Sequence, residues 1–296
     1  MRIATIDIGT NSILLLIADV QNEKIIVIED IAQIVRIGKD ISKTKYISKD
    51  KIKEGLNLLK DYVSLCKNRN VDLIKAVGTA ALREAKNAKE FLDIVKEELN
   101  LNIKIISPFE EAYLTYLGVK TAKYAKGDLF IVDIGGGSTE FIITFDNNFD
   151  TLSLNIGSVK LTEKYIHSDP PSSEEVKKVE NEILRELERI PWNVLGKTLI
   201  GVAGTVTTLG AIYLKCEKFD PEKIDGLKLS FSDIESLRNL LLSLKFSERK
   251  KLKGLEEKRA DVIPVGATIL YLIMKKFDFS DVIVSNRGVR YGLLRW

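Results

Sequence analysis

The feature that most constrains this chain is a short turn, rich in aspartate and glycine, that occurs twice. The first copy is Asp7-Ile8-Gly9-Thr10-Asn11-Ser12, and the second is Asp133-Ile134-Gly135-Gly136-Gly137-Ser138-Thr139-Glu140. Each copy follows one apolar run and precedes another, which predicts a strand, a tight turn and a second strand. Glycine lets backbone N–H groups approach phosphate oxygens, and each aspartate can hold a metal ion or its water. The repeat therefore predicts two hairpins that can bind one polyphosphate.

The residues after the second turn distinguish it from better-known nucleotide-binding loops. A dinucleotide-binding turn or a P-loop opens directly into a helix, whereas residues 141–145, Phe-Ile-Ile-Thr-Phe, favour a strand. A single Asp-x-Gly turn is usually only a hairpin. Its duplication favours the phosphate-binding interpretation.

Hydrophobic patterning predicts the same α/β order in both halves of the chain. In the first half we expect a hairpin to about residue 20, strands over 25–28, 32–37, 73–77 and 103–106, and helices over 49–68 and 91–99. In the second half we expect a hairpin around Asp133, strands over 151–155 and 198–202, and helices over 161–165, 173–189 and 206–214. Ser107 is a predicted cap of a helix that runs to about Lys123.

This order predicts two tandem α/β domains, residues 1–123 and 124–296, with a ligand cleft where the hairpins face each other. Residues 289–296 leave the second boundary open, because they can also pack back onto the first domain. A further glycine turn at 201–205 precedes a helix. Its glycines have two interpretations, an anion site at the helix N-terminus or tight packing between strand and helix.

The composition limits the chemistry that the chain can use. His167 is the single histidine, which excludes histidine-based metal centres and most Ser-His-Asp schemes, so carboxylates must carry acid–base work. We expect His167 in a surface loop, and Cys66 and Cys216 as buried apolar filler without disulfide or metal chemistry. The apolar stretches 13–20 and 262–274 are too short or too interrupted to span a bilayer, so we expect a cytoplasmic protein without a membrane partner.

Positive charge is concentrated in one segment, although the formal net charge is only +3. The residues that crowd it are Lys245, Arg249, Lys250, Lys251, Lys253, Lys258 and Arg259. They form either a solvated helix face paired with neighbouring glutamates or a surface that binds a polyanion, and the residues alone do not decide. No aromatic stacking pattern accompanies them, so a nucleic-acid partner is not expected.

Taken together, these motifs resemble the Ppx/GppA family of exopolyphosphatases and guanosine pentaphosphate phosphohydrolases, a branch of the actin, sugar-kinase and heat-shock ATPase superfamily. The resemblance runs nearly end to end, and Glu110-Glu111-Ala112 with residues 133–140 are its most specific parts. It implies two tandem ribonuclease H-like domains around an interdomain cleft. It also implies Mg²⁺-dependent release of terminal phosphate from inorganic polyphosphate, with guanosine pentaphosphate as a further substrate.

The resemblance also implies roles for particular residues. Glu111 matches the catalytic base of the family, and Asp133 and Glu140 match acidic residues that position metal and water. Asp7, in the first turn, completes the expected metal-binding set. The expected phosphate contacts are Asn11, Ser12, Arg83, Gly136, Gly137 and Ser138, and the family places positive residues near its substrate channel where Lys250 and Arg259 lie here.

Without the resemblance, plainer interpretations of these side chains stay open. Glu110 and Glu111 can simply complement a helix dipole, Glu140 can be a surface charge on an edge strand, and Arg83 can form an ordinary helix salt bridge. Three residues depart from the family pattern, namely Pro108, Asn286 and Tyr291. Pro108 raises the question of a tilted helix at Glu111, and the other two put only C-terminal contacts in doubt.

Two rival functions remain at this point. One is an ATP-dependent kinase or chaperone-like switch of the same superfamily, which needs a purine site and an acceptor pocket. The other is a sensor that binds polyphosphate or guanosine tetraphosphate and does not depend on Glu111. The sequence leaves open the preferred polyphosphate length, the choice between polyphosphate and guanosine pentaphosphate, ADP or ATP binding, and assembly as a homodimer.

Overall fold

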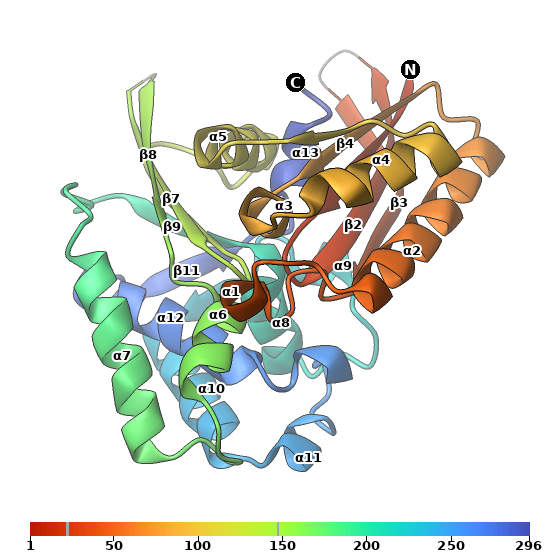
Figure 1. Cartoon of the computed structure of the whole chain (residues 1–296). Coiled ribbons are helices and arrows are strands. Elements are labelled where there is room, and N and C mark those ends of the chain that lie inside the picture. The colour runs from red at the N-terminus through yellow and green to blue at the C-terminus, as the bar shows by residue number, and fades with distance from the viewer. Residues whose placement is uncertain (22–23, 147) are drawn as a thin grey trace. The chain divides into compact units, whose positions relative to one another are not determined.

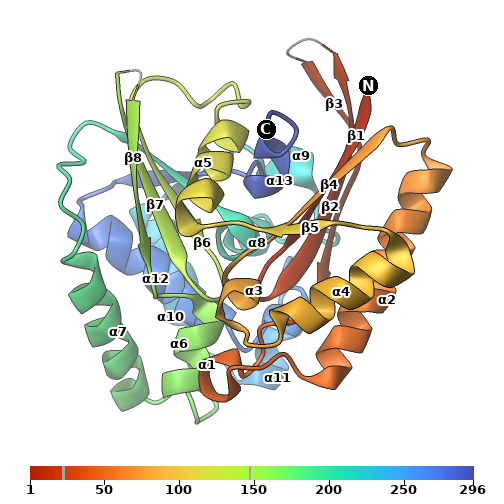
Figure 2. The ribbon, with the colours of Figure 1, turned by 45° about the horizontal axis from the view of Figure 1, so that its top comes forward.

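The computed structural model describes residues 1–21, 24–146 and 148–296 (Figures 1 and 2). The chain forms two compact units. Unit 1 comprises Met1–Gly118 and Val289–Trp296, and unit 2 comprises Val119–Gly288. The division into domains of residues 1–123 and 124–296 stays a prediction, and the compact units differ from it in residues 119–123 and 289–296. Residues 289–296 therefore belong with the first part of the chain, which is the option that the sequence left open.

Unit 1 is built on a five-stranded sheet of order β3-β2-β1-β4-β5. Its strands are β1 (Arg2–Ile8), β2 (Ser12–Gln21), β3 (Lys24–Ile34), β4 (Leu73–Gly78) and β5 (Ile103–Ile105). The first three strands pair antiparallel, whereas β1, β4 and β5 run parallel. The prediction of separate strands at 25–28 and 32–37 was wrong, because a bulge opposite Ile17 and Ala18 lets β3 continue as one strand.

Among the residues that the structure describes, six helices belong to unit 1 or end at its border. They are α1 (Ile41–Thr44), α2 (Lys49–Asn68), α3 (Ala80–Glu84), α4 (Ala88–Leu99), α5 (Pro108–Val119) and α13 (Val289–Gly292). Helices α2 and α4 lie on the same face of the sheet (Figure 2), where Ile6, Leu59 and Phe91 are fully buried. Helix α13 packs on the opposite face, because Tyr291 clusters with Ile3, an odd-numbered residue of β1.

Unit 2 repeats this plan with one extra strand, in the order β10-β11-β9-β6-β7-β8. Its strands are β6 (Leu129–Ile134), β7 (Thr139–Phe145), β8 (Asn148–Leu154), β9 (Thr198–Val202), β10 (Lys228–Ser230) and β11 (Asp281–Val284). Strands β6, β7 and β8 pair antiparallel, as β1, β2 and β3 do in unit 1. Strands β6, β9 and β11 run parallel, as β1, β4 and β5 do. The predicted duplication of one α/β plan is confirmed.

The helices of unit 2 surround one central helix. They are α6 (Ser158–Tyr165), α7 (Ser173–Leu187), α8 (Ala203–Tyr213), α9 (Pro221–Ile224), α10 (Phe231–Ser243), α11 (Phe246–Arg249), the 3-10 helix η1 (Glu257–Arg259) and α12 (Ile263–Lys276). Residues 263–274 of α12 are all buried, and this helix packs against α6, α7, α8 and α10. A helix that is apolar on every side is the expected centre of such a layer.

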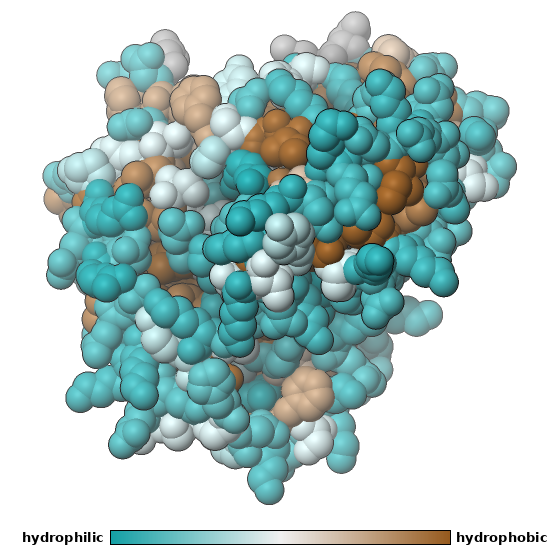
Figure 3. Space-filling view, in the orientation of Figure 1, coloured by the Kyte–Doolittle hydropathy of each residue, from teal (hydrophilic) through white to brown (hydrophobic). Residues whose placement is uncertain are grey.

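The single histidine and the two cysteines can be compared with their predicted positions. His167 is exposed and Cys66 is buried, as predicted, whereas Cys216 is only partly buried. Hydrophilic side chains cover most of the face shown in Figure 3. Among the helices of the described residues, none has the length and apolar character needed to cross a membrane.

Candidate active site

The two predicted phosphate turns close in the same way. In the first, the N–H of Gly9 donates to the carbonyl of Ser12 over 2.9 Å, and in the second the N–H of Gly135 donates to the carbonyl of Ser138 over 3.0 Å. A Cβ atom on Gly9 would lie 3.2 Å from the Ser12 oxygen, and one on Gly135 would lie 3.1 Å from the Ser138 oxygen. Both contacts are tighter than most Cβ atoms accept, so glycine suits this position in both copies.

Each turn is supported by a later segment that the sequence analysis did not include in the site. The N–H groups of Arg36 and Gly38 donate to the carbonyls of Asn11 (2.8 Å) and Thr10 (2.9 Å). In unit 2, the N–H groups of Ser158 and Val159 in α6 donate to the carbonyls of Gly135 and Gly136, each over 3.0 Å. The turn carbonyls are thus bonded to the protein.

The N–H groups of the turns are arranged differently from the carbonyls. In the part of the chain that the structure describes, those of Thr10, Gly136 and Gly137 donate no hydrogen bond to the protein. Gly157 lies so close to Gly136 and Gly137 that a Cβ atom would overlap their backbone. Gly157, the residue just before α6, was the only sign in the sequence that this segment supports the second turn. Unbonded N–H groups on a rigid turn are suited to binding phosphate oxygens.

The second hairpin carries two buried carboxylates side by side. Asp133 on β6 lies directly opposite Glu140 on β7, and Ser153 on β8 lies opposite Glu140, so all three side chains point to one face of the sheet. Glu140 is 1% exposed and accepts hydrogen bonds from Ser138 Oγ (2.7 Å) and Ser153 Oγ (2.8 Å). Glu140 is therefore not a surface charge, which excludes the plainer interpretation.

These oxygens fit the donor set of a Mg²⁺ ion. Like charges directly opposite on a sheet repel, and a bound cation relieves that repulsion. Within the described residues, no group of three or more His, Cys, Asp and Glu side chains could hold a metal ion. Mg²⁺ commonly uses only one or two carboxylates, together with water and substrate phosphates. In the first hairpin, Leu14 occupies the position opposite Asp7, so that turn offers one carboxylate instead of two.

The two glutamates at the start of α5 have different surroundings. Glu111 is 8% exposed, and Arg83 Nη1 donates to Glu111 Oε2 over 2.6 Å and to the carbonyl of Ile106 over 2.9 Å. Arg83 is carried by α3, directly after β4, and Glu111 by α5, directly after β5. The structure therefore brings together the two predicted site residues of unit 1 that lie 28 positions apart.

Glu110, by contrast, serves the helix terminus. Its side chain forms an ion pair with Lys104 (2.8 Å) and accepts a hydrogen bond from the N–H of Ser107 (2.8 Å). These contacts lower the pKa of Glu110 to about 2. The predicted cap is confirmed, since Ser107 Oγ accepts from the N–H of Glu110 (3.2 Å), although α5 ends at Val119 and not near Lys123. Pro108 is the first residue of α5, where the absence of an N–H group costs nothing.

The basic segment of unit 2 is partly neutralised by the protein itself. Arg249 is buried, with its side chain 4% exposed, and forms an ion pair with Asp169 over 3.2 Å. Lys250 forms an ion pair with Glu257 over 3.0 Å, and Lys253 pairs with Glu217. This segment therefore combines structural ion pairs with surface charge.

Arg259 has a different place, beside the third glycine turn. Its guanidinium group lies where a Cβ atom on Gly204 would be, at the start of α8. Gly201 shows tight strand–helix packing, because its Cβ atom would lie 2.7 Å from Val206 Cγ1. Of the two residues predicted to bind substrate in this segment, Arg259 is thus next to a helix N-terminus and Lys250 is paired with an acid.

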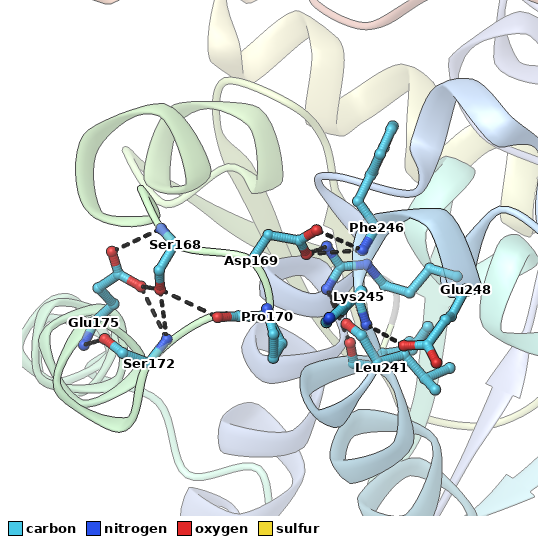
Figure 4. A network of polar contacts seen from close by, with 11 residues as sticks. Ser168, Asp169, Pro170, Ser172, Glu175, Leu241, Lys245, Phe246 and Glu248 are labelled. Carbon is cyan, nitrogen blue, oxygen red and sulfur yellow. Dashed lines mark hydrogen bonds and ion pairs between the residues drawn. The ribbon is translucent and has the colours of Figure 1, made fainter.

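Figure 4 shows how the loop before α7 holds the basic segment. Both carboxylate oxygens of Asp169 accept from the N–H of Phe246, over 2.7 and 3.0 Å. On the other side of this loop, Glu175 accepts from Ser168 Oγ and from the N–H of Ser172 (2.9 Å). The hydroxyl of Ser168 and the backbone N–H groups lower the pKa of Glu175 to about 2.

This network predicts an acid sensitivity of unit 2. A depressed carboxyl pKa contributes stability above the ordinary value of 4.5, and this stability is lost as the pH falls toward 2. We expect urea unfolding to show a steeper loss of stability between pH 5 and pH 2 (roughly the window given by linkage) for the wild type than for Glu175→Gln. The difference should stay below about 1 kcal/mol, because the group lies near the surface. Glu174→Gln is the matched control, and an equal pH dependence in Glu175→Gln and the wild type would contradict the assignment.

The remaining departures from the family pattern have local roles. The N–H of Asn286 donates to Asp225 Oδ1 over 3.1 Å, and the hydroxyl of Tyr291 donates to Asp30 Oδ2 over 3.1 Å. Gly288 lies next to the second hairpin, because its Cβ atom would be 3.9 Å from Asp133 Oδ2. Sequence reasoning did not include Gly288 in the site, and its only signal was its place near the predicted C-terminal contacts.

Two copies of one sheet plan, each with an Asp-Gly hairpin turn after its first strand, define an α/β protein of the ribonuclease H-like, actin-type class. Within that class the chain belongs to the Ppx/GppA phosphatase family, whose model matches residues 16–295.

Curated relatives and solved structures agree with this placement. Exopolyphosphatase 2 of Mycobacterium tuberculosis is 31% identical over 99% of this chain and 97% of its own length. A bifunctional 3-dehydroquinate synthase/phosphatase of Fusobacterium nucleatum is 37% identical over 98% of this chain, which spans only 46% of that relative. The Aquifex aeolicus crystal structure of the family has a TM-score of 0.85 at 35% identity, covering 99% of this chain and 96% of that one. The crystal structure of an exopolyphosphatase from Cytophaga hutchinsonii has a TM-score of 0.91 at 30% identity, covering 100% of this chain and 97% of that one.

Proposed function

We propose that the chain is a Mg²⁺-dependent exopolyphosphatase, which hydrolyses the terminal phosphoanhydride bond of inorganic polyphosphate and releases orthophosphate. The observation that carries the proposal is the buried Glu111 carboxylate, held by Arg83 at 2.6 Å in a family of phosphatases. Guanosine pentaphosphate is a second proposed substrate. It is supported by a relative named guanosine-5'-triphosphate,3'-diphosphate pyrophosphatase from Pseudoalteromonas atlantica, 27% identical over 98% of this chain and 57% of its own length.

In the proposed reaction, Glu111 orients a water molecule and accepts its proton as the water oxygen attacks the terminal phosphorus. The bridging P–O bond breaks, and the shortened polyphosphate leaves with the electron pair. Arg83 Nη1 fixes the Glu111 carboxylate, while the other nitrogens of the guanidinium group can contact phosphate oxygens. A carboxylate held in this way is already oriented before the water attacks.

The phosphate groups are assigned to the turns and to cations. The N–H groups of Gly136 and Gly137, with Ser138, would bind phosphate oxygens of the substrate, and Asn11 and Ser12 would serve the first turn in the same way. Asp133 and Glu140, with Asp7 in the first hairpin, would hold Mg²⁺, which when bound neutralises charge on the transferred phosphoryl group. Lys250 and Arg259 would attract the polyanion. We propose that these phosphate-binding and metal-binding residues act in the same reaction as Glu111 and Arg83.

The test is orthophosphate release from long polyphosphate, short polyphosphate, guanosine pentaphosphate and ATP in parallel, with Mg²⁺ and with EDTA. We expect release from polyphosphate that falls at least about tenfold when the metal is removed. Tight polyphosphate or guanosine tetraphosphate binding without release would favour a sensor, and phosphate transfer from ATP to an acceptor other than water would favour a kinase. A cytoplasmic location and assembly as a homodimer stay predictions.

A further inference from the structure

We infer that the C-terminal segment of unit 1, Val289–Trp296, is a positioning element for Glu111, with Gly292 as its main contact to α5. This inference rests on the proposed function, because it concerns the base of the same reaction. Glu111 is the proposed catalytic residue, whereas Gly292 would act only through the placement of α5.

The segment meets α5 at the backbone. A Cβ atom on Gly292 would overlap the carbonyl oxygen of Leu114 and would lie 2.6 Å from its carbonyl carbon and 2.9 Å from its Cα atom. Leu114 follows Glu111 by three positions, so both lie on one side of the helix. Leu114 also packs with Val289 and Leu293 in one buried cluster. Any residue larger than glycine at position 292 must therefore separate α13 from the part of α5 that carries Glu111.

The C-terminal segment is tied to the sheet of unit 1. Arg290 forms a buried ion pair with Asp30 over 2.9 Å, and Thr5 Oγ1 donates to the carbonyl of Arg290 over 2.8 Å. Lys75 Nζ donates to the carbonyl of Leu293 over 3.0 Å. These bonds join the C-terminal segment to β1, β3 and β4, so a side chain at position 292 is expected to displace α5 and not the sheet.

A second contact joins the end of the segment to the first turn of α5. Lys104 Nζ lies 4.1 Å from the centroid of the Trp296 ring and 2.8 Å from Glu110 Oε1. Glu110 is the residue next to Glu111. The segment thus contacts α5 on both sides of the proposed base, through Leu114 and through Lys104.

The test is a double-mutant cycle of Gly292→Ala with Glu111→Gln, using orthophosphate release from polyphosphate. A misplacement of about 1 Å can cost on the order of 100-fold, so we expect Gly292→Ala to lower kcat at least about tenfold with little change in KM. In the Glu111→Gln background we expect a further loss of less than about twofold, because a displaced helix no longer matters once the base is absent. A merely structural role would lower both backgrounds by the same factor.

Gly55→Ala is the matched control. Gly55 lies in α2 of the same unit, and its Cβ atom would meet Phe91 carbons at an ordinary distance of 3.5 Å. We expect this variant to keep the kcat of the wild type. Trp296→Ala is the second variant if Gly292→Ala does not fold, and removal of its ring contact is expected to lower kcat about threefold, again only when Glu111 is present.

The inference is overturned if folded Gly292→Ala keeps kcat within about twofold of the wild type, or if it loses the same factor in both backgrounds. Where Gly292→Ala does not fold, an unchanged kcat in Trp296→Ala overturns it. A wild-type protein that releases no orthophosphate from any phosphoanhydride would instead refute the proposed function, so the two failures are distinguishable.

Discussion

Replacing Glu111 with glutamine is expected to reduce orthophosphate release from polyphosphate by about 100-fold to 10,000-fold. The amide keeps the size of the side chain and can still accept a hydrogen bond from Arg83, which donates over 2.6 Å in the native protein. It cannot accept the proton of the attacking water. The loss should therefore appear in kcat, while polyphosphate binding, measured by equilibrium titration, should stay close to that of the wild type.

The neighbouring glutamate provides the control. Glu110 has the same side chain on the same helical turn, but it pairs with Lys104 and bonds to Ser107. Glu110→Gln should therefore lose less than about 1 kcal/mol of stability. Its kcat should fall by no more than about threefold, as expected for Trp296→Ala, because both variants weaken the contact made through Lys104. If Glu110→Gln and Glu111→Gln lost the same activity, or if Glu111→Gln turned over normally, Glu111 would not be the base.

Local pattern was sufficient to predict the elements that depend only on neighbouring residues. The helix over 49–68 and the strand over 198–202 have the predicted bounds, and both hairpins lie where the turns predicted them. The prediction failed where distant contacts decide. Residues 35–37 leave the β3 ladder because the N–H groups of Val35 and Arg36 donate to the carbonyl of Asn11 instead. Helix α12 offered no amphipathic pattern, since residues 263–274 are buried on all sides.

The candidate site was predictable in its residue types and not in its arrangement. The local pattern alone shows Glu110 and Glu111 as equivalent, and only the family resemblance distinguished Glu111. In the structure, the contact of Glu111 with Arg83, 28 positions away, separates the two side chains. Gly38 and Gly157 were missed for a similar reason. Each is required because its backbone approaches a turn at least 20 positions earlier, and the glycine alone does not show which turn it supports. That Asp133 and Glu140 share one face was not predicted, and it follows from the strand register, which places the two residues directly opposite each other.

The largest expected effect on stability comes from the ion pair between Asp30 and Arg290. Their side chains are 9% and 12% exposed, and Arg290 Nε donates to Asp30 Oδ1 over 2.9 Å. Burial lowers the pKa of Arg290, but the Asp30 carboxylate more than offsets it, so that the pKa is raised. Asp30→Asn keeps the shape of the side chain and leaves a buried guanidinium group without its counter-charge. We expect the free energy of unfolding to fall by about 3–5 kcal/mol.

Tryptophan fluorescence during urea unfolding can locate this loss. The chain has two tryptophans, Trp296 in the same segment as Arg290 and Trp192 in unit 2, so a Trp192→Phe background leaves only the reporter of unit 1. Asp19→Asn is the control, because Asp19 pairs with Arg2 at the same 2.9 Å but is 29% exposed. An exposed ion pair contributes little to stability, so equal shifts in the two variants would show that burial does not govern the Asp30 pair. A large shift in Asp30→Asn alone would show that a residue 260 positions away in the sequence anchors the C-terminal segment to unit 1.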